Sequence, residues 1–67
     1  MTNARRLARQ LIQDNGPGEF LVSFMESQEA RDIGEALKGF GCKVETRRDG
    51  ITLQVLVPEP LPDLSPR

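Results

Sequence analysis

The sequence predicts a small α+β domain with the element order α-β-α-β-β. Apolar residues recur at helical spacing in two segments, and they cluster or alternate at strand spacing in three others. An Asp-Gly pair joins the last two strand segments and is a signal for a hairpin. With 67 residues the chain has room for one domain, 1–57, followed by a proline-rich tail, 58–67, expected to be extended and flexible.

The first helix is expected to begin almost at Met1 and to end near Asn15. Its apolar residues fall at i, i+3, i+4, i+7 and i+8, which places five side chains on one stripe: Ala4, Leu7, Ala8, Leu11 and Ile12. Thr2 is a candidate N-cap. The Asn-Gly-Pro-Gly run at 15–18 provides both a left-handed stop and a residue that does not continue a helix.

A strand is expected at Phe20–Met25, because this short segment is rich in β-forming residues and apolar on both faces. The second helix follows, with Ser27 as its candidate N-cap. Its apolar residues recur at helical spacing and are Ala30, Ile33, Leu37 and Phe40. Gly34 weakens the middle of this helix by about 1 kcal/mol relative to alanine.

The last two strands are expected at Lys43–Arg47 and Ile51–Val57, on either side of the Asp49-Gly50 turn. The first alternates charged and uncharged residues, as a half-solvated strand does. In the second, Ile51, Leu53, Val55 and Val57 share one face.

Composition excludes several classes of function. A formal charge of −1 gives no general attraction to nucleic acid or anionic lipid, and no apolar run approaches the roughly 20 residues of a membrane span. A single cysteine forms no internal disulfide, which favours a cytoplasmic location. With no histidine and scattered carboxylates, we expect no metal site, cofactor, small-molecule substrate or catalytic residue, and an enzyme is the least favoured class.

Several short motifs and their order along the chain resemble the TusA/SirA-like sulfur-carrier family. They are Pro17-Gly18-Glu19 before the first strand, Arg31-Asp32-Ile33 in the second helix, Gly41-Cys42, Asp49-Gly50 and the apolar strand that follows. The resemblance covers about Ala4 to Val57. It implies a two-layer α/β sandwich, with two helices on one face of a mixed three-stranded sheet and the last strand in the middle.

The chain also departs from the family pattern at the position of the family's reactive cysteine. Members of the family begin with an additional strand and a Cys-Pro-x-Pro motif, whose cysteine carries a persulfide. Aligned on that pattern, this chain has Met1 at the cysteine and Thr2 and Ala4 at the prolines. The carrier chemistry requires a thiolate at a helix N-terminus, which a methionine thioether does not provide. Cys42 is a possible thiol, but its place at the end of a helix favours a structural role over a reactive one.

Two surfaces are candidates for partner binding. The first is a basic face of the first helix formed by Arg5, Arg6 and Arg9. This face either binds an acidic or phosphate-bearing partner or is simply solvated. Arg9 also matches a basic position of the resembled family. In the resembled fold the additional strand lies beside Phe20–Met25, so the resemblance implies that without it this strand is at a sheet edge. Phe20, Val22 and Phe24 share one of its faces. An apolar edge favours self-association, as a homodimer, or a protein partner there or across a sheet face formed by Leu21, Met25 and Leu56.

These observations leave three functions. The first is a non-catalytic, sulfur-carrier-like protein that acts through protein contact, as an accessory or regulatory component of sulfur transfer. The second is a sulfur carrier in a relay, using Cys42 or a missing upstream segment. The third is a small RNA-binding module, because the C-terminal domain of the third bacterial initiation factor has a similar layout. Near-neutral charge and few aromatic residues weigh against nucleic acid.

Overall fold

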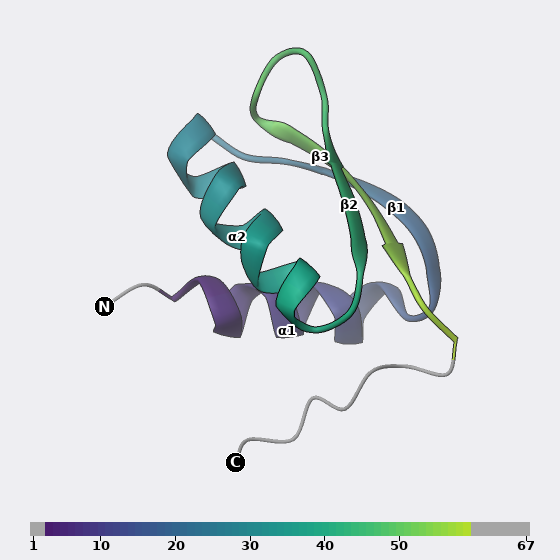
Figure 1. The fold of residues 1–67 in the computed structure, drawn as a ribbon. Helices are drawn as coiled ribbons and strands as arrows, with labels where there is room; N and C mark the ends of the chain where they lie inside the picture. Colours follow the sequence, from purple (N-terminus) through teal and green to yellow (C-terminus); the bar gives the residue numbers. More distant parts are fainter. Residues whose placement is uncertain (1–2, 60–67) are drawn as a thin grey trace.

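A computed structural model describes residues 3–59, which form two helices and three strands (Figure 1). In chain order these are α1 (Ala4–Asn15), β1 (Gly18–Ser23), α2 (Ser27–Gly39), β2 (Lys43–Thr46) and β3 (Thr52–Val57). The α+β class and the order α-β-α-β-β are therefore confirmed. Met1 and Thr2, the positions of the altered motif and the candidate cap, lie outside the described residues, as does the tail from residue 60 onward.

The three strands form one sheet in the order β1-β3-β2, so the last strand lies in the middle, as expected. Both pairings are antiparallel, and the sheet is therefore antiparallel throughout rather than mixed. The reason is geometric. The α2 connection brings β2 back in the same direction as β1, but β3 inserts between them and runs opposite to both, so the two parallel strands never pair.

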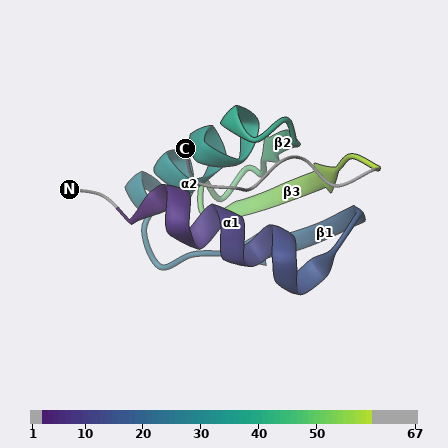
Figure 2. The same ribbon diagram turned by 90° about the horizontal axis from the view of Figure 1, so that it is seen from below.

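Both helices cover one face of this sheet, in two layers (Figures 1 and 2). The buried residues of β3 alternate, as a strand with one covered face requires. They pack into a single core with three residues from each helix; the nine are Ala4, Ala8, Ile12, Ala30, Ile33, Leu37, Leu53, Val55 and Val57. The small side chains where α1 meets α2 let these two helices approach closely.

The structure differs from the sequence-based expectation in several places. Helix α1 begins only at Ala4, and β2 and β3 are each one residue shorter than expected. Leu7 is 45% exposed, because the stripe of α1 that reaches the core is narrower than the apolar pattern. Helix α2 begins at Ser27 itself, with Glu26 at the N-cap and no side-chain cap bond. Strand β1 lies two residues earlier than expected because pairing with β3 fixes where it begins and ends: Gly18 pairs with Val57, and Ser23 pairs with Thr52.

The turn between β2 and β3 is held by Asp49. Its carboxylate accepts hydrogen bonds from the backbone N–H of Ile51 (3.0 Å) and Thr52 (2.9 Å) and from the Thr52 hydroxyl (2.7 Å). The Thr52 hydroxyl, followed by the two backbone groups, lowers the pKa of Asp49. This contribution is present above the ordinary carboxyl pKa and is lost as pH falls through the lowered one. Gly50, at φ +76°, supplies the left-handed residue of the turn.

Candidate protein-contact surface

Strand β1 has one unpaired backbone edge in the described part of the chain, because its only sheet partner there is β3. The N–H of Phe24 donates to the carbonyl of Ile51 at 2.8 Å, which shows that this residue points its backbone groups toward β3. In an antiparallel pair successive residues alternate in this respect. The N–H and C=O groups of Glu19, Leu21 and Ser23 therefore point away from β3, and we call these six groups the free edge.

The sheet face opposite the helices carries no covering layer among residues 3–59. Eight strand side chains lie on this face. Ser23 and Thr52 lie next to the β2–β3 turn, and the other six, which we call the open face, are Glu19, Leu21, Lys43, Glu45, Gln54 and Leu56. Leu21 is 60% exposed and Leu56 is 41% exposed. Glu19 and Lys43 flank Leu56 in the pairing register, so opposite charges lie on either side of an apolar centre. A depression of about 140 Å³ lies among five of these residues, all but Leu21.

The structure places the predicted edge-strand side chains on the other face. Phe20, Val22 and Phe24 are half-buried and pack against the core beneath the helices. The free edge therefore presents backbone N–H and C=O groups to a partner, and the side chain of Leu21 lies beside them. Of the three residues expected on an exposed sheet face, Leu21 and Leu56 lie there, whereas Met25 is exposed but lies beyond the end of β1. Sequence reasoning missed Glu19 and Ser23, although the pairing of β1 with β3 places both on the same face as Leu21.

The three arginines of α1 are only partly available to a partner. Arg6 is exposed and Arg9 is half-buried. The Arg5 guanidinium lies over the ring of Phe40, 5.5 Å from its centroid, in a cation–π contact between α1 and the end of α2. Arg5 therefore has a structural contact in addition to any docking role.

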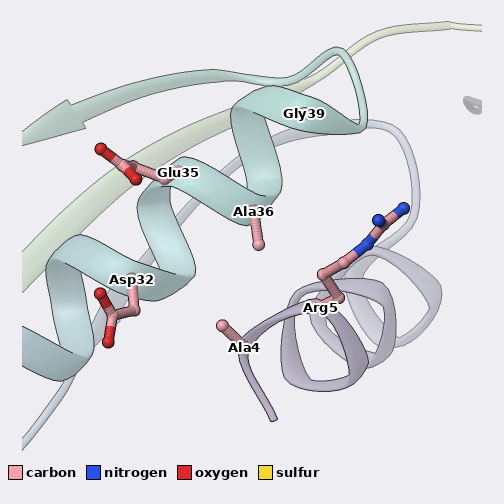
Figure 3. Close-up of a pocket in the computed structure, with 6 residues that line it drawn as sticks. All are labelled: Ala4, Arg5, Asp32, Glu35, Ala36 and Gly39. Atoms are coloured by element: carbon pink, nitrogen blue, oxygen red, sulfur yellow. The ribbon is translucent and has the colours of Figure 1, made fainter. Parts of the chain in front are cut away.

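A groove of about 420 Å³ runs between α1 and α2 beside Arg5 (Figure 3). Ala4 and Ala36 face one another across it. Arg5 lies at the end near Gly39, and the carboxylates of Asp32 and Glu35 lie toward the other end. The two carboxylates and the guanidinium thus do not converge on a common point, and the groove lacks the cluster of directed polar groups that a catalytic site needs.

Cys42 is buried between α2 and β2. Its residue is 6% exposed and belongs to the hydrophobic core, and its backbone N–H donates to the carbonyl of Leu37 at 3.1 Å. Burial raises the pKa of the Cys42 thiol. Burial and a raised pKa both disfavour the thiolate, and they favour a structural role for this side chain over a reactive one.

This burial predicts a distinct pH dependence of stability. As pH rises, the unfolded chain ionises its thiol first, so the contribution of the neutral thiol is complete below about pH 8.5 and is lost as pH rises through the raised pKa. Urea denaturation followed by circular dichroism should therefore show the free energy of unfolding falling more steeply above that pH in the wild type than in Cys42→Ala. Equal slopes, together with rapid alkylation of the native protein at neutral pH, would contradict a buried thiol.

Neither described helix has the length and apolarity needed to cross a membrane. In the same part of the chain no three His, Cys, Asp or Glu side chains gather in a way that would hold a metal ion. The chain was also compared with protein-family models, curated proteins and solved structures, and none of them matched it.

Proposed function

We propose that this chain is a non-catalytic, sulfur-carrier-like protein that works through protein contact, as an accessory or regulatory component of sulfur transfer. The observation that carries the contact is the free edge of β1. Three N–H and three C=O groups there have no partner strand among residues 3–59, beside a leucine that is 60% exposed. Such an edge is a template for an added strand.

The proposed link to sulfur transfer rests on the short sequence motifs between Pro17 and Val57, which resemble those of the sulfur-carrier family. The absence of catalysis is supported by the thiol. Cys42 is the one cysteine of the chain, and its burial and raised pKa weigh against a persulfide on it. The RNA-binding alternative gains no support, because the open face carries two carboxylates and no aromatic ring on which a base would stack.

A reconstituted relay tests this proposal. A cysteine desulfurase and a thiol-bearing sulfur carrier are combined with and without this chain, and the persulfide on the carrier is followed by mass spectrometry. We expect the chain to change the transfer rate several-fold without gaining a sulfur atom itself. The effect should be lost in Leu21→Lys and kept in Gln13→Lys, a matched exposed change on α1. A stoichiometric sulfur adduct on Cys42, or an unchanged rate, would refute the proposal.

A further inference from the structure

We infer that the free edge of β1 pairs with the same edge of a second copy of this chain, antiparallel and with Leu21 on the twofold axis. This inference rests on the proposed role of the edge as a protein-contact surface, and it names the partner.

The outward groups of β1 are self-complementary. They come from three alternate residues, Glu19, Leu21 and Ser23, so a twofold axis through the middle one pairs Leu21 with itself and Glu19 with Ser23 of the second copy. Each copy then presents three N–H and three C=O groups, and the two copies together form six hydrogen bonds. No outward group of the strand remains without a partner.

Neighbouring registers satisfy fewer groups. Moving the axis to Phe20 places Ser23 opposite Pro17 of the second copy, and proline has no N–H to donate. Moving the axis to Val22 places Glu19 opposite Met25, which lies beyond the end of β1. The register centred on Leu21 therefore fits the whole length of β1.

Side chains and charges agree with the same register. On the open face, Leu21 meets Leu21 of the second copy, which covers a side chain that is 60% exposed in one chain. On the helix-covered face, Phe20 meets Val22, and Gly18 leaves room for the ring of Phe24. Glu19 lies opposite an uncharged serine, and four residues of strand, about 14 Å, separate it from Glu19 of the second copy, beyond the screening length at physiological salt.

The assembly is a continuous sheet of six strands, three from each copy, with Leu21 of both copies at the centre of its open face. A contact made by one short strand and its side chains is small compared with the roughly 1,200–2,000 Å² of stable interfaces, so the dimer should dissociate in the micromolar range.

Disulfide trapping tests the register. Residues directly opposite in a hydrogen-bonded antiparallel pair have Cα atoms about 5.5 Å apart, within the range of a disulfide. Under mild oxidation, Leu21→Cys should give a covalent dimer at least about tenfold faster than Glu19→Cys, whose own counterpart lies about 14 Å away. The double variant Glu19→Cys/Ser23→Cys should again crosslink. Equal crosslinking of Leu21→Cys and Glu19→Cys would overturn the register.

Sedimentation equilibrium tests the dimer in the unmodified chain. We expect a concentration-dependent dimer that Leu21→Lys weakens at least about tenfold, because two like charges then meet on the axis, while the matched change Leu56→Lys on β3 keeps it. A strict monomer up to about 1 mM would overturn the inference.

The two proposals fail in different ways. A monomer that still alters sulfur transfer through Leu21 would exclude the second copy as the partner but would leave the proposed function in place. A dimer with no effect on sulfur transfer removes that function and keeps this contact.

Discussion

Replacing Leu53 with alanine should lower the free energy of unfolding by about 2–5 kcal/mol. Leu53 lies on the central strand of the sheet, is fully buried and packs in the core beneath both helices. Its truncation removes apolar contacts and leaves a cavity that the surrounding helices fill only in part. A domain of 67 residues has a total stability of roughly 3–10 kcal/mol, so this one change removes much of it.

Urea denaturation followed by far-ultraviolet circular dichroism measures the effect, at one fixed protein concentration so that self-association does not enter the comparison. Leu56→Ala is the matched control. Leu56 belongs to the same strand and is the same residue type, but it points to the open face and is 41% exposed. It should cost less than about 1 kcal/mol. A loss of similar size for the two variants would mean that the helices do not cover the face of the sheet that carries Leu53.

The sequence was sufficient to predict the elements whose signals are local. The alternation from Ile51 to Val57 predicts that Leu53, Val55 and Val57 share a buried face, and their burial is confirmed; between them Thr52 and Gln54 are half-buried and Leu56 is exposed. The Asp49-Gly50 turn is confirmed as well, because a carboxylate that accepts local backbone N–H groups and a left-handed glycine act within a few residues. The end of helix α1 at Asn15 was predicted for the same reason, whereas its start lies at Ala4, later than expected.

Features that depend on packing between distant segments were predicted less well. The central position of β3 was expected from the resemblance alone, and the antiparallel direction of both strand pairs follows only when this position is combined with the α2 connection and the hairpin. The hardest feature to predict was which side chains of the candidate contact surface face outward. An apolar strand at an edge indicates a contact, but whether Phe20 or Leu21 faces outward depends on which side the helices cover. One register, set by β3, decides this for the whole strand.

The size of the residue at position 34 should decide the sign of its effect on stability. Gly34 is buried in the middle of α2, where the helix lies against β2 and β3. A Cβ atom added there would lie 3.5 Å from the Leu53 Cδ1 atom and 3.5 Å from the Val44 Cγ1 atom, which is ordinary van der Waals contact. Gly34→Ala therefore improves helix propensity without a clash and should raise the free energy of unfolding by about 1 kcal/mol.

Gly34→Leu should have the opposite effect and lower the free energy of unfolding by about 1–3 kcal/mol, because three further carbons have to enter a packed layer between helix and sheet. Gly39 is the matched control: it ends the same helix, and an added Cβ would meet no atom within 4 Å. Leucine at this position should therefore be tolerated. If alanine at position 34 destabilised the protein in denaturant titrations, α2 would lie closer to the sheet than the 3.5 Å contacts allow. If leucine were tolerated equally at both positions, the close approach of α2 to the sheet at Gly34 would be wrong.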